Sequence, residues 1–163
     1  MRYVWPIIFL ILAAGLQGNL PNAISIWGAK PDLVLVVLIS YALAVDPIFG
    51  SVLGFAAGLI YGSFVGLSLG SFIVTRTITG FLAGFVTTRL FSENPIVPVI
   101  SAIWLTLVCE SLFLLANPRP DLSLAFRKIA GECINNGIFT LILYYTMRNM
   151  ENRRKNRLVN SRI

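Results

Sequence analysis

Residues 48–65 read IFGSVLGFAAGLIYGSFV, an apolar stretch without a charged side chain. About 20 apolar residues cross the hydrocarbon core of a bilayer, so this stretch is predicted to be a transmembrane helix. Glycine recurs at every fourth position, at Gly50, Gly54, Gly58 and Gly62. Residues four apart lie near one face of a helix, with a drift of about 40° per step. In lipid such a row lets a neighbouring helix approach closely, and we expect that neighbour within the same chain rather than in a second subunit.

The rest of the chain has the same character. Of its 163 residues, 56% are hydrophobic and 12% are charged, and the mean hydropathy is +0.80, which is unlike a soluble domain. The apolar segments are 3–18, 33–45, 48–65, 69–91, 96–116 and 124–147, and Gly80 and Gly84 repeat the four-residue spacing in the fourth. We therefore predict an all-α membrane protein, a bundle of six transmembrane helices formed by residues 1–147 and followed by a basic cytoplasmic tail, residues 148–163.

Two segments allow other interpretations. Residues 33–45 are short and cross the bilayer only if the helix extends through Lys30 or Asp46, so five spans plus a re-entrant segment is the alternative. Residues 3–18 have the charge and apolar run of a signal peptide. Because Ala13 and Ala14 make a weak cleavage site and further spans follow, we expect a retained first helix.

The distribution of basic residues predicts the orientation. With six spans both termini lie on one side, and Lys and Arg are enriched in cytoplasmic loops. The side of the termini receives Arg2, Arg89, Arg148, Arg153, Arg154, Lys155, Arg157 and Arg162, and the other side receives Lys30, Arg119, Arg127 and Lys128. Both termini are therefore predicted to be cytoplasmic. The net charge of +6 lies mostly in the tail, so we expect contact with anionic membrane lipid and no nucleic-acid binding.

Three charged residues are predicted to lie at membrane depth within the apolar segments: Arg76, Glu110 and Glu132. Each lies six or seven residues from the predicted outer surface, or roughly 9 to 10 Å deep at 1.5 Å per residue. Buried charge in a membrane requires a partner. We expect Arg76 to neutralise one or both glutamates. The expected hydrogen-bonding neighbours are Asn135, Asn136 and Thr106. The alternative is a polar pocket that opens to the outer face, with Lys30 and Asp32 at its rim.

Little in the sequence supports catalysis. Histidine is absent and the two cysteines, Cys109 and Cys133, lie in apolar stretches, so neither a metal site of ordinary ligand spacing nor a serine hydrolase with a histidine base is expected. The glutamates are not accompanied by a phosphate-binding glycine loop. No cofactor and no catalytic residue are therefore predicted.

Several motifs resemble the rod shape-determining protein MreD family. They are Lys30-Pro31-Asp32-Leu33, Gly50-Ser51-Val52-Leu53-Gly54-Phe55, Gly58-Leu59-Ile60, Leu67-Ser68-Leu69-Gly70 and Gly80-Phe81-Leu82-Ala83-Gly84. The order and length of the segments agree over nearly the whole chain. One departure is Gly62, which stands where the family often has an aspartate, so no role of that acid transfers to this chain.

The resemblance implies a bacterial inner-membrane component of the cell-wall elongation complex. The family is similar in fold to the substrate-binding subunits (S-components) of energy-coupling-factor vitamin transporters, which have six helices and an outward-facing cavity. Its partners are the bitopic protein MreC, a RodA glycosyltransferase, a class B penicillin-binding transpeptidase and MreB filaments. By the same resemblance, Lys30, Pro31 and Asp32 lie at the outer entrance and the glycines pack the bundle.

Two functions follow as hypotheses. The first is a non-catalytic scaffold that maintains rod cell shape by binding an MreC-like protein and, directly or indirectly, peptidoglycan synthases and MreB. The alternative is a substrate-binding subunit of a vitamin transporter, with a small polar ligand at Arg76, Glu110 and Glu132. Such subunits dock through paired alanines on the first helix. Only Ala14 and Gly18 have the required spacing here, which argues against the alternative.

Overall fold

The computed structural model describes residues 4–66, 68–90, 96–118 and 120–160. Over these ranges the chain is helical: α1 (Val4–Gln17), the short 3-10 helix η1 (Asn22–Ile24), α2 (Leu33–Ala42), α3 (Pro47–Val65), α4 (Leu69–Leu90), α5 (Ile96–Ala116) and α6 (Leu122–Asn160). The described residues form no β-strand. The predicted all-α class is therefore confirmed. Among the residues named above, Arg2, Leu67, Arg119 and Arg162 lie outside the described ranges.

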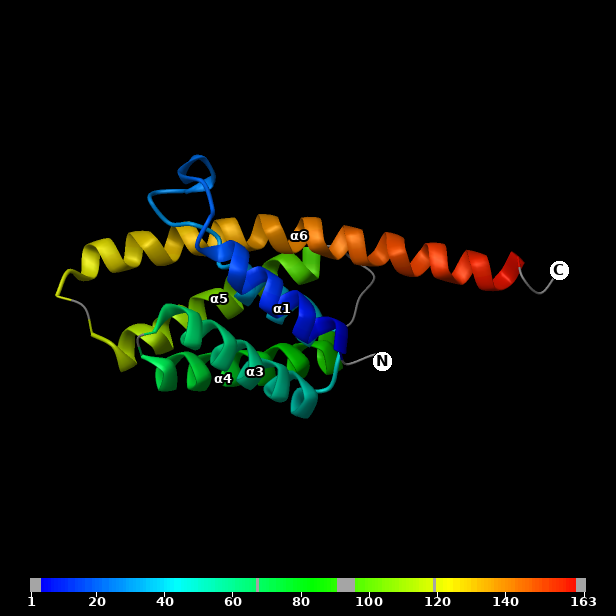
Figure 1. The fold of residues 1–163 in the computed structure, drawn as a ribbon, viewed down its shortest axis with the longest axis horizontal. Helices are drawn as coiled ribbons and strands as arrows, with labels where there is room; N and C mark the ends of the chain where they lie inside the picture. The colour runs from blue at the N-terminus through cyan, green and yellow to red at the C-terminus, as the bar shows by residue number, and fades with distance from the viewer. Residues whose placement is uncertain (1–3, 67, 91–95, 119, 161–163) are drawn as a thin grey trace.

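The helices form a bundle with α1 beginning at the end from which α6 emerges (Figure 1). Helix α6 continues far beyond the other helices at that end. The predicted sixth helix ended at residue 147, but the structure continues it through Asn160. No glycine or proline lies between residues 138 and 160, so the polar tail contains nothing that stops a helix.

Among the described residues, three helices are long and apolar enough to cross a membrane: Pro47–Val65, Leu69–Val86 and Ile96–Ala116. The apolar part of α1, Trp5–Gln17, and helix α2 are shorter. These lengths identify the chain as a membrane protein. Six complete spans remain a prediction.

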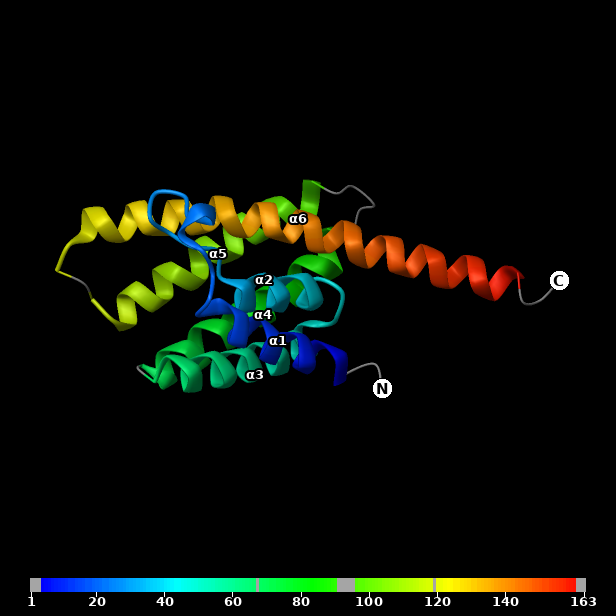
Figure 2. The same ribbon diagram turned by 45° about the horizontal axis from the view of Figure 1, so that its top comes forward.

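Helix α2 is the centre of the bundle. It contacts α1, α3, α4, α5 and α6, and it lies among them in Figure 2. Its ten residues are about 15 Å long, half the hydrocarbon thickness. Val34, Leu35, Leu38 and Ile39 are almost completely buried. A helix that is apolar on all sides is expected to be surrounded by protein, so α2 is covered by its neighbours rather than by lipid.

Glycines join α3 to α4. A methyl group added to Gly50 would collide with the carbonyl of Gly80, and one added to Gly54 would collide with the carbonyl of Arg76. Gly58 faces the backbone of Phe72 and Ile73 in the same way. On the other helix, Gly80 meets Gly50, and Gly84 meets the backbone of Asp46 and Pro47. Gly62 faces Leu69. The row of small residues thus places the two backbones in contact within one chain.

Candidate functional site at one end of the bundle

The chain reaches α2 through a folded loop that enters the bundle. Ile26 and Ala29 exchange two backbone hydrogen bonds of 2.9 Å around a tight turn. Its central residues, Trp27 and Gly28, have φ values of 52° and 81°, as the type I′ turn requires. Gly131 of α6 makes room for this turn, because a side chain there would collide with the carbonyl of Ile26. The loop therefore lies directly against α6.

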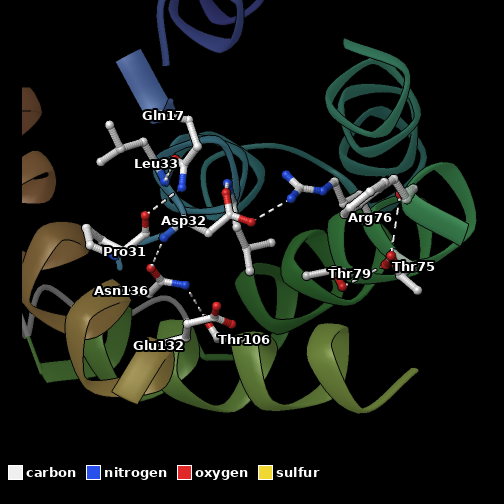
Figure 3. A network of polar contacts seen from close by, with 12 residues as sticks. Gln17, Pro31, Asp32, Leu33, Thr75, Arg76, Thr79, Thr106, Glu132 and Asn136 are labelled. Carbon is white, nitrogen blue, oxygen red and sulfur yellow. Dashed lines mark hydrogen bonds and ion pairs between the residues drawn. The ribbon is translucent and has the colours of Figure 1, made fainter. Parts of the chain in front are cut away.

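Side-chain amides form hydrogen bonds with the backbone N–H and C=O groups of this loop, as Figure 3 shows for Gln17 and Asn136. Asn135 of α6 donates to the carbonyl of Ala29 at 2.9 Å, and Asn136 accepts from the amide of Asp32 at 2.8 Å. Gln17, at the end of α1, donates to the carbonyl of Pro31 and accepts from the amide of Leu33, both at 2.8 Å. Buried backbone that is not helical needs such partners, since neither lipid nor packed side chains can replace them. The two asparagines thus hold the loop in place.

Asp32 joins this loop to α4. One carboxylate oxygen accepts from the amide of Leu35 at 2.9 Å and caps α2, and the other binds Arg76 Nη2 at 2.5 Å. The side chains are buried, with 10% of Asp32 and 2% of Arg76 exposed. Figure 3 shows the two groups pointing at each other from α4 and the start of α2. Each charge neutralises the other, so loss of either side chain would leave an uncompensated charge inside the bundle.

Aromatic rings complete the surroundings of Arg76. Its guanidinium carbon lies 4.2 Å from the centre of the Tyr61 ring and 5.5 Å from that of Phe72. Such stacking is favourable for a desolvated guanidinium. Arg76 Nε and Nη1 make no hydrogen bond to the described residues. The rings are therefore the neighbours that stabilise this part of the guanidinium.

The ion pairs differ from the expected ones. Arg76 pairs with Asp32 rather than with Glu110 or Glu132, and Glu132 lies 3.3 Å from Lys128, one helical turn away. The pairing of Arg76 was predicted wrongly because Asp32 was not considered as its partner, whereas the loop places Asp32 inside the bundle, where its side chain is buried. Of Lys30, Pro31 and Asp32, which were expected at the outer entrance, Lys30 alone is partly exposed.

A cavity of about 430 Å³ lies beside this cluster. Its lining comes from helix ends and loops that meet at one end of the bundle. The lining residues are Gln17, Lys30, Asp32, Tyr61, Val65, Ser68, Phe72, Glu110, Phe113, Asn117, Pro118, Lys128 and Glu132. Lys30, Asp32, Glu110 and Glu132 are thus brought together, whereas Arg76, Asn135 and Asn136 are not part of the lining. With charged groups, amides and aromatic rings but no described histidine or cysteine, the cavity is suited to binding.

The sequence analysis did not identify Gln17, Tyr61 or Lys128 as site residues. Gln17 could have been noticed as a polar residue in the first apolar segment. Lys128 precedes Glu132 by four residues, which is the spacing of an ion pair on a helix. No local signal marks Tyr61, because its contact with Arg76 depends on the packing of α3 against α4.

Comparison with known proteins gives one family. The family model described as rod shape-determining protein MreD matches residues 1–154. No curated protein and no solved structure matches the chain.

Proposed function

Because the chain belongs to the MreD family, whose members act in rod shape determination, we propose that it is a non-catalytic scaffold of the bacterial cell-wall elongation complex. The observation that carries this proposal is the extent of the family match, which includes all six α-helices up to residue 154. The scaffold binds an MreC-like bitopic protein. The RodA glycosyltransferase, the class B transpeptidase and MreB filaments associate with it directly or through that partner.

The outer surface of the bundle supports a role in association within the membrane. Large apolar side chains are exposed on several helices, including Trp5 and Leu12 of α1, Val52 and Phe55 of α3, and Trp104 of α5. The glycines that join α3 to α4 already pack against each other's helix inside the chain. A partner helix would therefore pack against the exposed apolar side chains, where it replaces lipid through dispersion contacts.

The proposed location is the inner membrane, with both termini in the cytoplasm. The positive-inside rule supports this orientation, because the end from which α6 emerges carries the basic tail. The cavity then opens toward the outer side of the membrane.

Affinity purification tests the scaffold. The full chain, tagged at its C-terminus and expressed at native level, should recover an MreC-like protein and a transpeptidase from native membranes. An unrelated tagged protein with six membrane helices serves as the control. Depletion should round a rod-shaped cell. Recovery of neither partner, together with unchanged cell shape after depletion, would overturn the proposal.

The cavity favours a second candidate, a substrate-binding subunit of a vitamin transporter. A volume of about 430 Å³ lies within the range of small-molecule sites. The first helix argues against it, since Ala14 is only 4% exposed and Gly18 follows the last residue of α1. Copurification of paired ATPases with a coupling subunit, or of a vitamin, would favour this candidate over the scaffold.

A further inference from the structure

The lining of the cavity includes more carboxyl groups than basic groups. Asp32 is neutralised by Arg76, and Lys128 lies 3.3 Å from Glu132. Glu110 and Glu132 both line this cavity. No described lysine or arginine lies within ion-pair distance of Glu110. Glu132 therefore has Lys128 beside it, whereas the charge of Glu110 is left to a proton or to a positively charged ligand.

Lys30 contributes the opposite charge to the same cavity. Its ammonium group donates to the carbonyl of Leu20 at 2.6 Å, and no described carboxylate lies within 4 Å of it. An ammonium group has three donors, so two remain for another acceptor. The cavity thus offers one basic group and one acidic group, Lys30 and Glu110, that lack an ion-pair partner among the described residues.

Three aromatic side chains pack in a row in the lining of the same cavity. The rings of Tyr61 and Phe72 are 5.0 Å apart, and those of Phe72 and Phe113 are 4.6 Å apart. All three residues line the cavity. Such a row accommodates an apolar side chain, while the charged groups fix the orientation of a ligand, as in other small-molecule sites.

We propose that this cavity binds a small zwitterion of the size of an amino acid or a dipeptide. The ligand's ammonium group lies against Glu110 and its carboxylate against Lys30. A sphere of the cavity's volume is about 9 Å across, whereas an extended dipeptide is about 7 Å long. The site is distinct from the scaffold role, because it uses the interior of the bundle rather than its apolar outer surface.

Thermal unfolding of the full chain in lipid nanodiscs tests the site. The probes are the free amino acids and a set of dipeptides with apolar side chains, each compared with its N-acetylated and its amidated form. At least one zwitterion should raise the melting temperature. Its N-acetylated form loses the ammonium and its amide loses the carboxylate, so both should raise the melting temperature less.

Two variants separate a binding role from a structural one. Glu110→Gln should weaken binding of the zwitterion at least tenfold and abolish the preference for the free over the N-acetylated form. Lys30→Gln should abolish the preference for the free carboxylate over the amide. Asp121→Asn serves as the matched control, because Asp121 lies near the same end of the bundle but does not line the cavity. It should bind like the wild type.

The proposal is overturned if no zwitterion in the set stabilises the protein, or if the blocked forms stabilise it equally. It is also overturned if Glu110→Gln and Lys30→Gln change the affinity for the zwitterion but leave its advantage over the N-acetylated and amidated forms unchanged. Because the variants leave the outer surface intact, recovery of the MreC-like partner should be unchanged in both. Failure of zwitterion binding therefore leaves the scaffold proposal standing.

Discussion

Asp32 and Arg76 each have a role that depends on the other. Arg76 is buried, and Asp32 both neutralises it and caps α2. Removal of one member of a buried pair leaves an uncompensated charge, which costs far more than the pair itself contributes. Asn is as good an N-cap as Asp, so Asp32→Asn removes the charge while keeping the cap.

We expect Asp32→Asn to lower the free energy of unfolding by about 3 kcal/mol or more, because Arg76 then remains charged and unpaired. Asp32→Asn combined with Arg76→Leu should recover much of this loss. Asp46→Asn is the control, since Asp46 caps α3 through the amide of Phe49 at an exposed position. Thermal unfolding in nanodiscs measures all three. A double variant less stable than Asp32→Asn would contradict the explanation.

Asn136 acts on the loop that precedes α2. It accepts from the amide of Asp32 and donates to Thr106 Oγ1 at 3.2 Å, so Asn136→Leu leaves a buried amide without an acceptor. The expected loss is about 1 to 3 kcal/mol. Ile138→Leu, at an exposed position of the same helix, should have little effect. Equal melting temperatures for the two variants would show that the bond contributes nothing.

Among the helices, α2 shows that helix length alone does not predict which segments belong to this bundle. A ten-residue helix is too short to cross a bilayer, yet α2 is surrounded by five helices and its N-terminal end meets a loop with satisfied backbone. The bundle can therefore include a short helix, because protein rather than lipid surrounds its polar end.

The contact between α3 and α4 depends on specific glycines. A methyl group at Gly54 would overlap the backbone of Arg76 and Thr77, so Gly54→Ala should separate the helices and lower the melting temperature. Gly70, near the start of α4, has no heavy atom within 4 Å of an added carbon, so Gly70→Ala should be nearly neutral. Thermal unfolding in nanodiscs compares the two. Similar losses in both would contradict an effect of close packing.

The start of α6 is sensitive to pH. Asp121 accepts from Ser123 Oγ at 2.9 Å and from the amide of Leu124 at 3.3 Å, and these hydrogen bonds lower the pKa of its carboxyl group. The ionised Asp121 carboxylate stabilises the folded state fully above the ordinary aspartate pKa of about 3.9. This stabilisation is lost as pH falls through the lower pKa of the folded state. Ser123→Ala should raise that pKa toward its ordinary value in an NMR titration of the carboxyl carbon, and an unchanged midpoint would exclude the role of Ser123.

For the whole molecule, the distribution of charge and the direction of α6 determine how the protein sits in a membrane. The cavity and the loop before α2 lie at one end, and α6 emerges at the other. Only one of these ends carries the basic tail.

Cysteine labelling in intact cells checks the orientation. In a background with Cys109→Ala and Cys133→Ala, we expect Asp121→Cys to react with an impermeant maleimide. Arg154→Cys should react only after the membrane is permeabilised, because the positive-inside rule places the basic tail in the cytoplasm. The background without cysteines is the control for unspecific labelling. Labelling of Arg154→Cys in intact cells would reverse the assigned orientation.

The sequence alone determined the helical class and most helix positions, because the composition and spacing of apolar segments are local properties. The segment predicted at residues 96–116 has the same bounds as α5. The segment predicted at residues 33–45 extends three residues beyond the end of α2 at Ala42. The row of glycines in residues 48–65 likewise indicated close packing before any neighbour was known.

Only the tertiary structure decided which charges meet. Arg76 could have paired with any of several carboxylates, and depth along a helix did not distinguish them. The choice of Asp32 depends on a loop that folds into the bundle, where Gln17 of α1 and Asn135 and Asn136 of the distant helix α6 hold it. An ion pair requires contact between two specific side chains. The sequence encodes that contact only through the packing of the whole bundle.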